Sequence, residues 1–267
     1  MVSLVCAQTV QPPDRPRITP VQWVGLAVLV LLLLNQMGFL RAGDSPSSVL
    51  AAVLDRLPFL VALMLAIPIH EFSHGLVATL FGDDTPRKAG RLTLNPLKHL
   101  DPLGTLLILI GPIGWGRPMP INPAAMRNPN LGWALSSIAG PVSNVLAAAA
   151  CMGVFTLLYG SFDASLRQFL LGRTGDYTQL FFLTFFIINV SLAVFNLVPL
   201  PPLDGFGFVF GLVPRAVKIL LLPIRQYGPL ILLALVLVPA LRPVLSVYLG
   251  TGQRLIFGLL GVHPFGV

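Results

Sequence analysis

The stretch PFLVALMLAIPIHEFSHGLVATLFG, residues 58–82, decides how this sequence folds. It is long and apolar enough to cross a bilayer as a helix, because about 20 apolar residues suffice. It nevertheless carries two histidines and the only glutamate of the chain, within HEFSH at residues 70–74. Ionisable side chains inside a membrane segment are costly unless they are paired, so by default they mark function.

The spacing of these residues predicts a metal site. On a helix, residues i and i+4 share a face, so His70 and His74 point at one spot while Glu71 flanks it. This is the zincin pattern, in which two imidazoles hold Zn²⁺ and the glutamate takes a proton from water. A surface helix can carry the same letters as solvated polarity, but the apolar flanks argue against that interpretation.

Composition indicates an all-α, polytopic integral membrane protein. Hydrophobic residues make up 55% of the chain and charged residues only 10%, and the mean hydropathy is +0.84. The net charge of +7 fits basic loops on the inner side of a membrane better than nucleic-acid binding, which is not expected. Two cysteines, Cys6 and Cys151, are too few for a disulfide framework.

The apolar runs predict about five transmembrane helices. They cover residues 21–40, 58–82, 131–159, 177–199 and 226–249. The run 102–113 is too short to span and is expected to be re-entrant or interfacial. Segments 91–96 and 117–123 have a strand-like, proline-limited character, which predicts a small β-hairpin near the site with an edge for an extended peptide.

Three parts of the chain are expected. These are an N-terminal tail with the first helix and an outer connection (1–57), a membrane-embedded core (58–212), and a C-terminal membrane segment with an amphipathic tail (213–267). The loop 82–101 is rich in basic residues, and such loops face the cytoplasm. The N-terminus is therefore expected in the cytoplasm, with His74 about 12 Å from the cytoplasmic end of its helix.

Two histidines leave a catalytic zinc ion one protein ligand short. No second glutamate exists, so His99, His263, an aspartate or a cysteine remains. Asp204 follows the fourth apolar run in NLVPLPPLDG, residues 196–205, whose prolines break a helix and can deliver the aspartate inward. The alternative for Asp204 is an ordinary solvated turn at the membrane surface. His99 follows Lys98 in a basic loop and is expected to be solvated or interfacial, which makes it the second choice as a ligand.

These motifs resemble those of the site-2 proteases, membrane-embedded zinc metalloproteases that cleave peptide bonds in or near transmembrane segments of other membrane proteins. The resemblance rests on HEFSH and NLVPLPPLDG in that order and covers roughly residues 58–212. It implies that His70, His74 and Asp204 bind one Zn²⁺ ion per chain and that Glu71 is the catalytic base.

The compact prokaryotic branch of the family is the most similar. This implies a multi-pass protein of the cell membrane, without PDZ or CBS domains and with its active site nearer the cytoplasm. The implied partners are membrane-protein substrates and the lipid bilayer.

Two asparagines are candidate substrate-binding residues. Asn144 ends AGPVSN, residues 139–144, which resembles a Gly-Pro-x-x-Asn segment of the same family, and Asn196 begins the proline motif. Their amides can hold a substrate backbone, but Asn144 can equally bond a neighbouring helix and Asn196 can support the helix break. The alternative function is a transporter or an inactive protease relative with a structural metal or polar cluster. Neither explains zincin spacing together with a retained glutamate.

Overall fold

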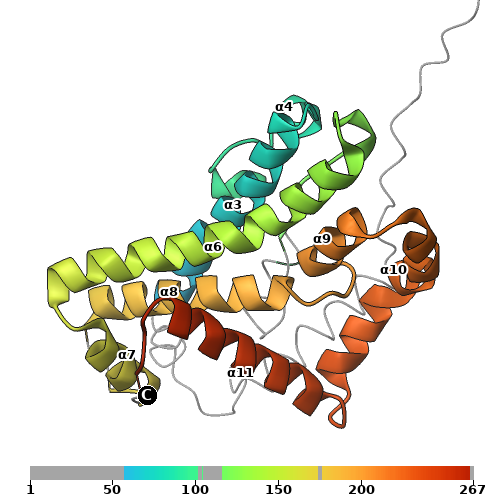
Figure 1. Ribbon diagram of the computed structural model, residues 1–267. Helices are drawn as coiled ribbons and strands as arrows, with labels where there is room; N and C mark the ends of the chain where they lie inside the picture. Colours follow the sequence, from blue (N-terminus) through green and yellow to red (C-terminus); the bar gives the residue numbers. More distant parts are fainter. Residues whose placement is uncertain (1–56, 102–103, 105–115, 174–175, 265–267) are drawn as a thin grey trace, which may run out of the picture.

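The computed structural model describes residues 57–101, 104, 116–173 and 176–264, and these are mainly helical (Figure 1). The α-helices are α3 (Leu57–Leu80), α4 (Thr85–Lys88), α6 (Pro129–Tyr159), α7 (Phe162–Leu170), α8 (Tyr177–Asn196), α9 (Asp204–Leu212), α10 (Arg215–Leu237) and α11 (Arg242–Leu259). Two short 3₁₀ helices, η1 (Pro96–Lys98) and η2 (Pro123–Ala125), lie in the loops. Four of the helices, α3, α6, α8 and most of α10, are long and apolar enough to cross a membrane. The predicted all-α polytopic fold is confirmed.

Three of the predicted spans, 58–82, 131–159 and 177–199, match α3, α6 and α8 to within a few residues. The first predicted span, 21–40, and most of the predicted re-entrant segment lie outside the described residues. The fifth span, 226–249, was placed wrongly.

The chain forms two helices where that fifth span was expected, because α10 ends at Leu237 and α11 begins at Arg242. The break contains Pro239, which lacks the N–H that a continuous helix needs at that point. Pro243 then lies in the first turn of α11, where a missing N–H costs nothing.

The proline-induced break after the fourth span is confirmed. Helix α8 ends at Asn196, residues 197–203 form turns, and α9 begins at Asp204. The prolines at positions 199, 201 and 202 all lie in this connection. After these turns, α9 packs against α6 (Figure 1).

Helix α6 lies at the centre of the helical assembly and contacts α3, α8 and α9 (Figure 1). Small residues allow the close approach of α9. Gly207 and Gly211 lie one turn apart on α9 and contact Ser137 and Ala134 of α6, and an added Cβ at Gly211 would lie 2.7 Å from the Cβ of Ala134. This is the small-xxx-small arrangement by which membrane helices pack closely, and it brings the start of α9 against α6.

An aromatic core lies where α6, α7, α8 and α11 meet. Phe162 of α7 contacts Phe155 of α6 and Phe186 of α8, with ring centroids 5.3 and 4.8 Å apart, and Phe186 also contacts Phe257 of α11 at 5.6 Å. Because lipid tails are as apolar as these rings, close packing rather than exclusion of water stabilises the assembly here.

The predicted β-hairpin is reduced to a single contact in the part of the chain that the structure describes. Leu100 and Gly116 form an isolated antiparallel bridge, and the N–H of Arg117 donates to the carbonyl oxygen of His99 at 2.8 Å. Residues 91–95 and 117–122 form no strand.

Candidate metal centre

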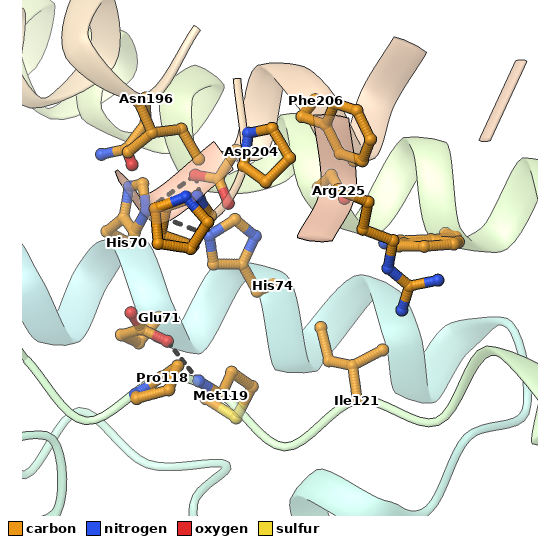
Figure 2. A pocket seen from close by; sticks show the side chains of 17 residues that line it. His70, Glu71, His74, Pro118, Met119, Ile121, Asn196, Asp204, Phe206 and Arg225 are labelled. Carbon is orange, nitrogen blue, oxygen red and sulfur yellow. Dashed lines mark hydrogen bonds and ion pairs between the residues drawn. The ribbon is translucent and has the colours of Figure 1, made fainter. Parts of the chain in front are cut away.

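Three side chains from two helices meet inside the protein. His70 and His74 lie one turn apart on α3, and Asp204 is the first residue of α9. The Nε2 atoms of the two histidines are 3.0 Å apart. Oδ2 of Asp204 lies 3.1 Å from Nε2 of His70 and 3.3 Å from Nε2 of His74 (Figure 2). Both imidazoles are buried.

Hydrogen bonds on the far side of each ring determine which nitrogen carries the proton. Nδ1 of His74 lies 2.7 Å from the carbonyl oxygen of Ser136, which can only accept. Nδ1 of His70 lies 2.6 Å from Oδ1 of Asn144, whose amide nitrogen donates to Oδ1 of Asn189 at 2.8 Å. Both Nδ1 atoms therefore donate, and both Nε2 atoms present lone pairs to the centre of the cluster.

This donor set fits a divalent metal ion such as Zn²⁺. Two unprotonated nitrogens and a carboxylate oxygen would repel one another at these distances without a cation between them. Oδ2 of Asp204 is buried and has no hydrogen-bond donor among the described residues. Tetrahedral ligands about 2.0–2.1 Å from zinc lie about 3.3 Å from one another, close to the separations found here.

Glu71 flanks the cluster and faces the loop that precedes α6 (Figure 2). Its Oε2 accepts a hydrogen bond of 2.7 Å from the backbone N–H of Met119. Within the described part of the chain, its other carboxylate oxygen has no hydrogen-bond partner. One oxygen of Glu71 is thus held in place while the other remains available to a water molecule in the site.

Two buried charged side chains anchor this loop on either side of Met119. Nη2 of Arg91 donates to the carbonyl oxygens of Arg117 and Pro118 at 2.6 and 3.4 Å. Oδ2 of Asp83 accepts from the N–H of Asn122 at 2.6 Å. Burial alone would raise the pKa of Asp83, but hydrogen bonds to its oxygens outweigh burial and hold the pKa below its ordinary value. The ionised carboxylate therefore keeps the loop against the end of α3.

A cavity of about 460 Å³ adjoins the cluster. Its lining comes from α3, the 118–121 loop, α6, the proline turn, α9 and α10: His70, Glu71, His74, Pro118, Met119, Ile121, Trp133, Ser137, Asn196, Pro201, Pro202, Leu203, Asp204, Phe206, Gly207, Arg225 and Pro229. The three cluster residues and Glu71 all border this space, so a molecule inside it can reach them together.

The structure places the two candidate asparagines differently. Asn196 lines the cavity, and its amide nitrogen donates to the carbonyl oxygen of Leu192 at 3.0 Å. Asn144 lies behind His70 and is held between that ring and Asn189. This position favours the helix-bonding alternative for Asn144, and substrate contact by either residue stays a prediction.

The other two candidate histidines lie outside the cluster. His99 is completely buried, with Nε2 2.7 Å from the carbonyl oxygen of Thr93, so the expectation of a solvated or interfacial residue is wrong. The loop folds back on itself and encloses the ring, which a basic sequence does not reveal. His263 is exposed, and its N–H lies 3.2 Å from Oδ1 of Asp163.

Two residues of the site were missed from the sequence. Asn189 supports Asn144, and Arg225 of α10 lines the cavity. Gly140 of α6, which belongs to the AGPVSN segment, lies against both imidazoles. Asn189 did carry a signal, because an amide inside the apolar run 177–199 needs a polar partner. A single arginine carries no comparable signal.

Replacing Asn144 by alanine is expected to weaken zinc binding about 10–100-fold, because the Nδ1–H of His70 loses its acceptor and the ring loses its fixed orientation. Competition with a chromogenic chelator, using the purified protein in detergent, measures the change. Asn196→Ala is the matched control, since within the described ranges its amide bonds only to Leu192 of its own helix. Equal zinc affinity in the two variants would contradict the support assigned to Asn144.

Replacing Gly140 by alanine is expected to lower zinc occupancy sharply. An added Cβ would overlap the ring of His74 and lie 2.7 Å from Cε1 of His70, so at least one imidazole must move. The matched control is Gly153→Ala on the same helix, where an added Cβ meets no described atom within 4 Å. Metal analysis of both purified variants tests this, and full occupancy in Gly140→Ala would show that the imidazoles do not lie where the structure puts them.

Fold and site together define a polytopic helical membrane protein with a buried His-His-Asp cluster and a flanking glutamate. The chain is 41% identical over 207 residues to YwhC of Bacillus subtilis, a protein named for an inferred zinc metalloprotease activity, and the match covers 77% of this chain and 92% of YwhC. The chain therefore belongs to the YwhC family of zinc metalloproteases.

Similarly named relatives are more distant. Rip2 of Mycolicibacterium smegmatis is 31% identical over 190 residues, which cover 67% of this chain and 66% of Rip2. Rip2 of Mycobacterium tuberculosis is 29% identical over 185 residues, with the same coverage of each chain. No family model and no solved structure matches the chain.

Proposed function

We propose that this protein is an intramembrane zinc metalloprotease of the site-2 type, which hydrolyses peptide bonds in or near transmembrane segments of other membrane proteins. The observation that carries the proposal is the convergence of His70 and His74 with Asp204 beside Glu71. Both histidines direct the lone pair of Nε2 toward the carboxylate of Asp204. All four residues border one cavity and belong to a helical assembly with four candidate membrane spans.

His70, His74 and Asp204 would hold the ion, and Glu71 would act as general base and acid. When bound, zinc supplies a Lewis acid that polarises water and the scissile carbonyl group. Glu71 takes the proton from water on its unbonded oxygen and later delivers it to the leaving amine. Met119 holds the carboxylate in position through its backbone N–H during both transfers.

The substrate backbone must be extended before it can be cut, because a helix keeps its carbonyl groups in internal hydrogen bonds. The residues beside Glu71 suit an extended chain, since the 118–121 segment lines the cavity without strand partners of its own among the described residues. Pairing of the substrate with this segment remains part of the proposal. Helix-breaking residues in the substrate span should therefore favour cleavage.

A transporter or an inactive relative would also place polar groups among membrane helices. Neither role requires a carboxylate next to the paired histidines, held by Met119 with one oxygen unbonded. The geometry therefore favours hydrolysis over a structural metal site.

The direct test uses the full-length, zinc-loaded protein in lipid nanodiscs with model transmembrane peptides, half of which carry a helix-breaking Asn-Pro pair. We expect mass spectrometry to find cuts within the apolar segment, and faster cutting of the peptides with the pair. Cuts confined to soluble flanks would contradict intramembrane cleavage, and an absence of any cut with zinc bound would favour the non-catalytic alternative.

A further inference from the structure

Among the described residues that line the cavity, Arg225 is the one basic side chain other than the two histidines. In Figure 2 it lies at the opposite end of the cavity from Asn196, with His70, His74 and Asp204 between them. An extended peptide that passes the metal centre along this line meets an amide at one end and a guanidinium group at the other.

Two aromatic rings hold the Arg225 guanidinium group. Its Cζ lies 5.4 Å from the centroid of Trp133 and 5.7 Å from that of Phe210, both within cation–π range. The helix that carries it is fixed against the proline turn, since a Cβ at Gly228 would lie 2.7 Å from atoms of Pro201. Arg225 is an exposed residue overall, and these contacts place its guanidinium group at the cavity wall.

Within the described ranges, no carboxylate pairs with Arg225. Of the two carboxylates among the described residues of the cavity lining, Asp204 faces the histidines and Glu71 accepts from the N–H of Met119, and neither forms an ion pair with Arg225. Stacking on aromatic faces leaves the N–H edges of a guanidinium group free, and those edges match the two oxygens of a carboxylate. A stacked arginine without an anionic partner, beside a reaction centre, is thus suited to bind an anion of the substrate.

We propose that Arg225 recognises a carboxylate of the substrate, so that the enzyme selects membrane segments with an aspartate or glutamate on one side of the scissile bond. This inference rests on the proposed protease function and defines its substrate class. A lipid phosphate is the competing anion, but Arg225 shares its cavity with the reaction centre, which favours the substrate.

The test separates recognition from hydrolysis by using the zinc-loaded Glu71→Gln protein in phosphatidylcholine nanodiscs. Fluorescent transmembrane peptides of one length carry either Glu or Gln at a single position, which is moved residue by residue along the segment. We expect the Glu peptide to bind about tenfold more tightly than its Gln partner at one or two adjacent positions on one side, as for a charge-assisted hydrogen bond.

Adding Arg225→Gln should bring the Glu-to-Gln affinity ratio close to one. Adding Arg225→Glu instead should reverse the preference, so that the Gln peptide binds more tightly than the Glu peptide. Lys218→Gln is the matched control. Lys218 lies on the same helix and also stacks on Phe210, at 5.4 Å, but it does not line the cavity. It should leave the ratio unchanged.

A ratio of one at every position would overturn the inference, as would an equal loss of preference in Lys218→Gln. A further set of nanodiscs with added phosphatidylglycerol tests the lipid alternative. An Arg225→Gln effect that appears only in those nanodiscs would also overturn the inference, because it would assign Arg225 to lipid. Hydrolysis by the wild-type protein is scored separately on the same peptides. Cleavage without acidic preference therefore refutes this inference alone, whereas acidic preference in binding without cleavage refutes the protease function alone.

Discussion

Replacing Glu71 by glutamine is expected to abolish measurable peptide hydrolysis while zinc remains bound. A general base contributes about 10²–10⁴-fold to the rate, and glutamine cannot take a proton from water at neutral pH. Glutamine keeps the length of the side chain and an oxygen that can accept from Met119, so the loop and the cluster should persist. Cleavage of a model transmembrane peptide and metal analysis of the same preparation measure both quantities.

The control for this prediction is Asp84→Asn, an acid-to-amide change at an exposed residue outside the cavity. It should leave the cleavage rate and the zinc content unchanged. A Glu71→Gln protein that cleaves at the wild-type rate would exclude Glu71 as the base. Loss of zinc together with activity would mean that Glu71 supports the metal instead.

Replacing Asp204 by asparagine is expected to weaken zinc binding by more than the roughly 10–100-fold that removal of an outer hydrogen-bond partner costs. The change removes the negative charge of a ligand whose Oδ2 lies 3.1 and 3.3 Å from the two Nε2 atoms. Two neutral imidazoles then remain, which is fewer than the three protein ligands of a catalytic zinc site. Chelator competition gives the affinity.

Two histidine variants accompany this measurement. His263→Ala should leave zinc affinity unchanged, since His263 is exposed and outside the cluster. If Asp204→Asn left zinc affinity unchanged and His99→Ala lowered it, His99 rather than Asp204 would be the third zinc ligand. The hydrogen bond between His99 and Thr93 argues against that outcome.

The sequence predicted the spans well where apolar runs were uninterrupted, as in α3 and α8. It failed for the region 226–249, because apolar composition continues through Pro239 while the helix does not. Backbone breaks depend on missing N–H groups, and hydropathy does not record these. The same principle, applied to the prolines before Asp204, predicted the end of α8 correctly.

The candidate site was partly accessible from the sequence, because HEFSH and NLVPLPPLDG are local patterns with a fixed geometry. The contacts that hold the histidine rings in place could not be predicted, since they join segments that are distant in the sequence. Examples are the carbonyl oxygen of Ser136 against His74 and the close approach of Gly140 to both rings. Arg225 also became a candidate only when the fold placed α10 beside the proline turn.

The central claim is that two distant segments hold one divalent ion between His70, His74 and Asp204. Anomalous diffraction at the zinc absorption edge, from crystals of the full-length protein, tests it most directly. We expect one strong peak about 2.0–2.2 Å from both Nε2 atoms and from a carboxylate oxygen of Asp204. No peak at that point in zinc-loaded crystals, or an Asp204 side chain directed to lipid or solvent, would contradict the account.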